Sequence, residues 1–217
     1  MTDFDEFRIR DTRRFVENLE DALAHTPPGQ PVPGLDSIEG ADASGTVYCV
    51  IRLDGHPVQV GITDGWWNAV GPHAIASAVL QAYRFAREKA TFARMVLRRH
   101  GRTWEPPSEG RDEDPYEPSY PAGHSGADDL DTLRRQIDQA TADMAAAMRL
   151  LDQVSSDEPR EVSGPRNLFT LVVRGTVIES ARVNEYGLRP EDASELAADA
   201  RDALLAARPS YARHGER

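Results

Sequence analysis

The stretch TVYCVIRLDGHPVQVGI, residues 46–62, decides the fold because it reads as two strands joined by a tight turn. Apolar residues alternate along both parts, as they do in strands that bury one face. Asp54-Gly55, between the two parts, is typical of a hairpin turn. The sequence therefore predicts a β-hairpin whose buried face consists of Val47, Cys49, Ile51, Leu53, Val58, Val60 and Ile62.

Helices are predicted on both sides of this hairpin. Residues 4–24 carry apolar side chains at alternating spacings of three and four, which indicates a helix with one buried stripe. Its stripe is Ile9, Thr12, Val16, Leu19 and Leu23. Residues 25–45 read as a loop, and Pro72 opens a long helix that runs to about residue 100.

The second half of the chain repeats this order. Residues 129–154 predict a helix, residues 168–183 a hairpin around Gly175, and Pro190 opens a last helix. A lone two-stranded hairpin is marginally stable, so we expect the two hairpins to pair. The predicted fold class is α+β, with two helix–hairpin–helix units pairing into a small antiparallel sheet covered by long helices. A single irregular α+β domain without duplication is the alternative.

An acidic segment separates the halves. Residues 105–128, EPPSEGRDEDPYEPSYPAGHSGAD, are rich in Pro, Gly, Ser and acidic residues. Proline removes backbone donors and like charges repel, so we predict a disordered linker. The predicted organisation is a first unit at 1–104, this linker at 105–128 and a second unit at 129–217.

Composition limits the function classes. One cysteine among 217 residues excludes an internal disulfide, and we find neither an apolar run that could span a membrane nor the apolar stretch of a signal peptide. These features favour a cytoplasmic protein. The histidines lack metal-ligand spacing, and no nucleophile or phosphate-binding loop motif is present. We predict no enzyme activity and no catalytic, cofactor or metal site.

A basic stretch stands out in this acidic chain of net charge −11. Residues 84–102, RFAREKATFARMVLRRHGR, hold seven basic residues and one acid. On a helical projection most of the arginines fall within an arc of about 80°, facing away from the aromatic side. Such a face is either simply solvated or binds an anion, because like charges at helical spacing repel. The predicted DNA-backbone contacts are Arg84, Arg87, Arg94, Arg98, Arg99 and Arg102.

Two anions are candidates for this face. DNA phosphates could lie along it, with salt-dependent affinity. Alternatively, the acidic linker folds back onto the basic helix that precedes it in the sequence and competes with an external anion.

Protein contacts form the other group of candidates. Trp66 and Trp67 lie between a strand and a helix, where they are either a partner hot spot or a cap over the core. Residues 129–154 show the apolar spacing of a coiled-coil seam, which needs a partner helix in the same or another chain. The predicted contact residues of that seam include Leu133, Ile137, Met144 and Leu151.

Both halves resemble one known family. LFTLVVRGTVIESARVNEYGLRPEDASELAADARDALLAA after a coiled-coil-like helix, and the pattern GTVYCVIRLDGHPVQVGITDGWWNAVGPHAIASAVLQAYRFAREKA, are similar to YbaB/EbfC proteins. These are small bacterial nucleoid-associated DNA-binding proteins that dimerise, and related domains occur in actinobacterial proteins associated with type VII (ESX) secretion. The resemblance implies an intrachain pseudo-dimer or homo-oligomer that binds DNA without sequence specificity in the cytoplasm. The alternative is a secretion-linked chaperone or adaptor, or a structural oligomerisation module.

Overall fold

The computed structural model describes residues 3–27, 30–104 and 158–208. The described chain is an α+β protein with small antiparallel sheets, as the sequence predicts. The elements of the first half are α1 (Asp3–His25), β1 (Ile38–Ala41), β2 (Val47–Ile51), β3 (Pro57–Ile62), α2 (Trp66–Ala69) and α3 (Ile75–Arg99). Those of the second half are β4 (Arg160–Ser163), β5 (Phe169–Arg174), β6 (Val177–Val183), two short 3-10 turns and α5 (Ala193–Ala206).

Each half contributes a three-stranded sheet. The strand orders are β1-β2-β3 and β4-β5-β6, and every neighbouring pair is antiparallel. The prediction of two strands per half was therefore wrong, because β1 lies in the stretch read as a loop and β4 lies between the predicted helix and hairpin, where no strand was expected. These strands have only four residues each, too few to show a clear alternation. Pairing of both hairpins into one sheet is also not seen among the described strands.

The opening hairpin forms as predicted, except that Ile62 is only partly buried and Val58 is exposed. Val47, Cys49 and Ile51 of β2 are fully buried, and Gly55 turns the chain with a φ of 83°. Val58, however, is 45% exposed. The register shifts opposite Val50 and Ile51, so that Ile51 pairs with Pro57 and leaves Val58 as the extra residue of a bulge. The bulge turns the Val58 side chain away from the core.

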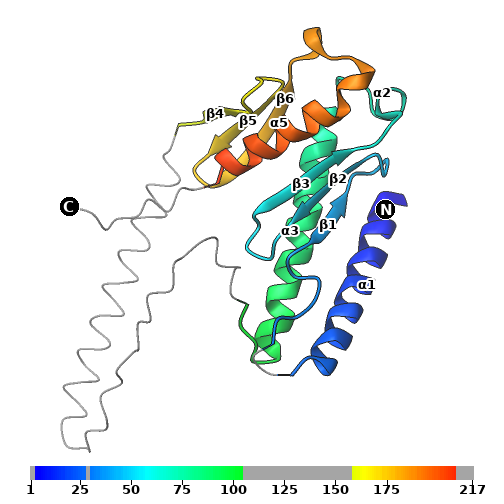
Figure 1. Ribbon diagram of the computed structural model, residues 1–217, viewed down its shortest axis with the longest axis vertical. Coiled ribbons are helices and arrows are strands. Elements are labelled where there is room, and N and C mark those ends of the chain that lie inside the picture. Colours follow the sequence, from blue (N-terminus) through cyan, green and yellow to red (C-terminus); the bar gives the residue numbers. More distant parts are fainter. Residues whose placement is uncertain (1–2, 28–29, 105–157, 209–217) are drawn as a thin grey trace, which may run out of the picture. The chain divides into compact units, whose positions relative to one another are not determined.

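The long helices connect the two halves. Helix α3 packs on β1 and β2 of its own half and contacts β6, whereas α5 packs most extensively on β3 of the first half and also covers β4 and β5 (Figure 1). Gly40 of β1 allows the close approach of α3, because a Cβ there would overlap the backbone of Ala82 and Ala86. The described parts of both halves consequently form one compact unit.

The same turn contact occurs in both halves. Gln81, the seventh residue of α3, accepts a hydrogen bond at Oε1 from the Ala43 N–H, 3.0 Å away, between β1 and β2. Asp199, the seventh residue of α5, accepts backbone N–H groups between β4 and β5. In each half, one side chain of the covering helix thus contacts the turn between the first two strands, although the first turn is also held by Asp42, which accepts the N–H groups of Ser44 and Val47.

Helix α1 lies beside the C-terminal part of α3 and runs parallel to it (Figure 1). Arg8 pairs with Glu88 near the start of this contact, and Arg99 pairs with Glu20 near its end. The predicted stripe of α1 is only partly buried, since Leu19 and Leu23 belong to the core but Ile9 is 59% exposed.

Two predicted segments fall outside the described residues. These are the acidic linker, 105–128, and the helix of residues 129–154, with the seam positions Leu133, Ile137, Met144 and Leu151. The proposed domain boundaries at both ends of the linker therefore stay predictions.

Candidate nucleic-acid interface on helix α3

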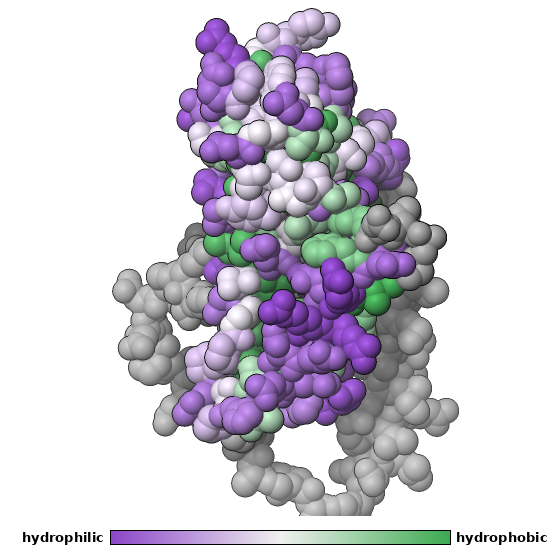
Figure 2. All heavy atoms as spheres, turned by 90° about the vertical axis from the view of Figure 1, so that its right-hand side faces the viewer, coloured by the Kyte–Doolittle hydropathy of each residue, from purple (hydrophilic) through white to green (hydrophobic). Residues whose placement is uncertain are grey.

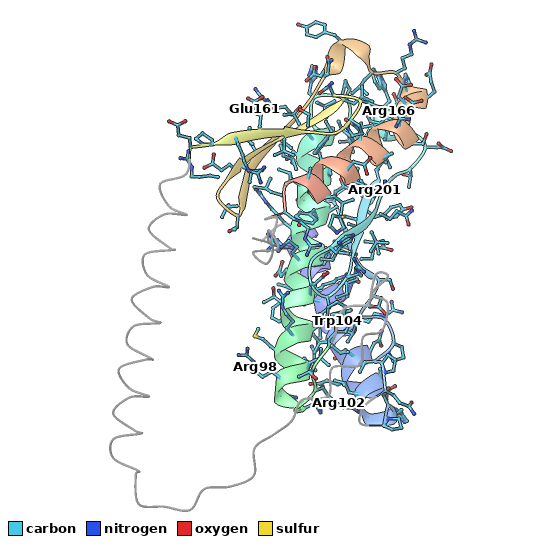
Figure 3. The ribbon with its side chains drawn as sticks, turned by 60° about the vertical axis from the view of Figure 1, so that its left-hand side comes forward. Arg98, Arg102, Trp104, Glu161, Arg166 and Arg201 are labelled. Carbon is cyan, nitrogen blue, oxygen red and sulfur yellow. The ribbon has the colours of Figure 1, made fainter. Side chains whose placement is uncertain are left out.

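The arginines of α3 lie at its surface, as the helical projection predicts. Arg84, Arg87, Arg94 and Arg98 are exposed, while Phe85, Ala86 and Ala90 on the opposite side belong to the core. Figure 3 shows Arg98 on the side of α3 that faces away from α1, and Arg102 at the end of the helix. Packing of the apolar side thus leaves a basic face in solvent.

Three of these arginines donate hydrogen bonds to backbone carbonyls of other elements. Arg84 donates to the Ile178 oxygen of β6 at 3.1 Å, and Arg94 donates to the Leu53 oxygen at 3.0 Å. Arg102 donates to the oxygens of Thr26 and Pro27 after α1. A carbonyl oxygen carries no net charge, so these bonds fix the guanidinium groups without neutralising them.

Two other cations of the basic stretch are balanced by acids of α1. Lys89 is only 7% exposed, pairs with Asp11 and donates to the Glu39 carbonyl oxygen at 2.8 Å. The Arg99 guanidinium lies 2.7 Å from the Glu20 carboxylate, which offsets the charge of one predicted DNA contact. The single acid of the stretch, Glu88, is itself occupied by Arg8. A count of charges within residues 84–102 could not show these ion pairs, because the partner residues on α1 lie about 80 positions earlier in the sequence.

Five cations then remain on one face, which we call the arginine face: Arg84, Arg87, Arg94, Arg98 and Arg102. Within the part of the chain that the structure describes, none of the five forms an ion pair with a carboxylate. Arg87 lies over the Tyr83 ring, 5.8 Å from its centroid. Burial raises the pKa of Tyr83 and outweighs the opposing effect of the Arg87 charge.

The two tryptophans pack mainly in the core and contribute little to the surface. Trp66 is fully buried, and its Nε1 donates to the Pro190 carbonyl oxygen at 2.9 Å, which links α2 to the second half. Trp67 is half-buried and packs edge-on against Trp66. This agrees with the core alternative and removes Trp66 from any accessible partner surface.

Replacement of Trp66 tests this link between the halves. We expect Trp66→Phe to lower the free energy of unfolding by about 1–2 kcal/mol, because the Pro190 oxygen loses its donor and the smaller ring leaves space. Trp67→Phe is the control and should cost less, since Trp67 is half-buried. Urea unfolding followed by far-ultraviolet circular dichroism measures both, and equal losses would contradict the role given to Trp66.

A groove between α1 and α3 is a surface that the sequence did not reveal. It measures about 830 Å³ and lies partly over apolar side chains that include Ile9 and Val16 of α1 and Phe92 of α3. Figure 2, which looks onto the α1 side, shows mostly hydrophilic side chains there, with hydrophobic ones between them. The sequence gives one indication of this groove: the predicted apolar stripe of α1 includes Ile9, which the fold leaves exposed.

In the ranges 3–27, 30–104 and 158–208, no group of three His, Cys, Asp or Glu residues is arranged to hold a metal ion. Over the same ranges, no helix is both long and apolar enough to cross a membrane.

Comparison with known proteins gives no relative. No family model, curated protein or solved structure matches the chain. The resemblance to YbaB/EbfC proteins therefore stays a prediction from the sequence.

Proposed function

We propose that the chain is a non-enzymatic, YbaB/EbfC-like DNA-binding protein that holds the phosphate backbone on the arginine face of α3. One observation carries this proposal: five arginines share a face, and none has a carboxylate partner among the described residues. Phosphate contacts supply most of the non-specific affinity for DNA, and they require uncompensated cations of this kind.

The geometry of the face suits a polyanion. From Arg84 to Arg98 the helix advances about 21 Å, which corresponds to about six base pairs of duplex, and Arg102 follows just beyond the end of α3. The carbonyl contacts of Arg84, Arg94 and Arg102 hold their guanidinium groups in place and leave further N–H donors for phosphate oxygens. Backbone contacts position a protein but do not read bases, so we propose binding without sequence preference.

The arrangement of the two halves supports the family proposal. Both halves show three antiparallel strands followed by a helix, and Gln81 and Asp199 occupy the same position in α3 and α5. We propose that the halves are two YbaB-like units that form a pseudo-dimer within one chain. A cytoplasmic, nucleoid-associated location follows from this proposal.

Removal of one exposed arginine tests the proposal. We expect Arg98→Gln to weaken binding to a duplex of about 20 base pairs by roughly threefold to tenfold, independent of its sequence, because one phosphate contact is lost. Arg14→Gln on α1 is the matched control, since it removes the same charge from an exposed site off the arginine face. Fluorescence anisotropy measures both affinities, and an equal loss in the two variants would argue against a defined interface.

A second candidate function is a protein-interaction module, such as a secretion-linked adaptor. The apolar groove between α1 and α3 favours it, because exposed apolar surface of this kind marks interaction sites. Failure of the intact chain to bind duplex at low salt would favour this candidate. The acidic linker as an internal competitor for the arginine face stays a prediction, because it lies outside the described residues.

A further inference from the structure

A small pocket lies where the two halves of the described chain meet. It measures about 280 Å³, which is just below the usual range for pockets that bind drug-sized ligands. The pocket therefore has room for a small molecule or for a single chemical group of a larger one. Its polar lining comes from both halves: Asp54, Tyr83, Arg87, Thr176 and Arg208.

The lining of this pocket carries an excess of positive charge. Arg208 pairs with Asp54 at 3.5 Å, whereas Arg87 has no carboxylate partner within residues 3–27, 30–104 and 158–208. Two guanidinium groups thus face one carboxylate. The effective dielectric constant near a protein surface is lower than that of water, so the remaining charge attracts an anion more strongly than it would in bulk water.

The contacts of Arg208 hold its guanidinium group at the pocket. Nη1 donates to His56 Nδ1 at 2.6 Å, and Nη2 lies 3.5 Å from Asp54 Oδ2. Asp54 is fixed in turn, because its Oδ1 accepts the backbone N–H of His56 at 2.8 Å. A guanidinium group has five N–H donors, so Arg208 keeps donors for a further anion.

Arg87 reaches the same space from α3. Its guanidinium carbon lies 5.8 Å from the centroid of the Tyr83 ring, and Tyr83 is only 5% exposed. Burial raises the pKa of Tyr83, and the charges of Arg87 and Arg208 both oppose that shift. The two guanidinium groups therefore act on one hydroxyl at the wall of the pocket, from opposite halves of the described chain.

The surroundings of the pocket add to its positive charge. The C-terminal end of α5 would by itself disfavour an anion, but the Ala207 carbonyl oxygen accepts an N–H of Arg160 at 3.3 Å. A further cation lies at the border, where Arg84 donates to the carbonyl oxygen of Ile178, a residue of the pocket lining, at 3.1 Å. Both contacts favour an anion in the pocket.

Paired arginines are well suited to phosphate, because their N–H groups match its oxygens in pairs. We propose that this pocket binds a phosphate group between Arg87 and Arg208. The hydroxyl groups of Tyr83 and Thr176, which also line the pocket, can donate further hydrogen bonds. The phosphate belongs either to a small phosphate ester or to the backbone of bound DNA, and only the second source rests on the proposed function.

Thermal unfolding of the full-length chain with inorganic phosphate tests the proposal. About 20 mM phosphate should raise the melting temperature by about 4 °C relative to sodium chloride of equal ionic strength, as expected for a Kd of about 1 mM. Arg208→Gln should remove about two-thirds of this shift, because the affinity falls about tenfold when one guanidinium group is lost. Arg208 is not part of the arginine face, so this variant separates the pocket from that face. The control, Arg14→Gln, should keep the full shift because Arg14 is exposed on α1.

A second variant leaves the contacts of Arg208 in place. Thr176 is exposed in the turn between β5 and β6, so Thr176→Glu adds an opposing charge at the pocket without removing a buried group. It should also lose most of the phosphate shift. An unchanged shift in either Arg208→Gln or Thr176→Glu overturns the proposal, and so does the absence of a shift in the intact chain.

Duplex binding then distinguishes the two sources of phosphate. A DNA phosphate in the pocket predicts that Arg208→Gln weakens binding to a duplex of about 20 base pairs by roughly threefold to tenfold. A small phosphate ester predicts that Arg208→Gln loses the phosphate shift and binds duplex as Arg14→Gln does. A chain that binds inorganic phosphate but no duplex contradicts the proposed function and leaves the pocket assignment standing.

Discussion

Replacement of Asp199 with alanine is expected to lower the free energy of unfolding by about 3–5 kcal/mol. The Asp199 side chain is fully buried and accepts the backbone N–H groups of Arg166, Leu168 and Phe169 at 2.7, 2.9 and 2.8 Å. Alanine leaves these three donors without an acceptor inside the protein. An unpaired buried donor costs about 1–3 kcal/mol, so the losses together are large.

Asp202 on the same helix provides the control. Its carboxylate is partly exposed, and its contact is with the neighbouring Arg201 at 2.6 Å. Asp202→Ala should therefore cost less than about 1 kcal/mol. Chemical denaturation measures both variants. Similar losses for Asp199→Ala and Asp202→Ala would show that the turn between β4 and β5 does not depend on the buried carboxylate.

The central hairpin was predictable because its signal is local. Alternation over residues 47–53 and the Asp54-Gly55 turn are sufficient to place β2 and one end of β3. The bulge that exposes Val58 was not predictable, since it depends on the pairing of Ile51 with Pro57 across the turn. The short strands β1 and β4 are held by neighbouring strands and covering helices, which a local pattern does not record.

The candidate site was predictable in part for the same reason. The helical period places Arg84, Arg87, Arg94 and Arg98 in solvent correctly. It cannot show that α1 supplies Asp11 for Lys89 and Glu20 for Arg99, because these partners are distant in sequence. Among the described residues, the contacts with α1 leave five cations of the basic stretch without a carboxylate partner, and they also create the groove.

The role of Asp199 could not be predicted from the sequence. An acid in an alanine-rich helix, residues 193–206, reads as a solvated position. Only the fold brings its carboxylate to the turn between β4 and β5. Gln81 occupies the matching position in α3, but there the buried carboxylate that accepts the turn's N–H groups is Asp42, within the turn itself.

The salt dependence of DNA binding by the full-length chain tests the central claim most directly. Each neutralised phosphate contributes about −0.9 to the slope of log affinity against log salt concentration, so five arginines predict a slope of about −4 to −5. Between about 50 and 200 mM salt, the affinity should fall by several hundredfold. A slope of this size for duplexes of unrelated sequence is the result that we predict. No binding at about 50 mM salt, or a slope near zero, would contradict the assignment of the arginine face to DNA.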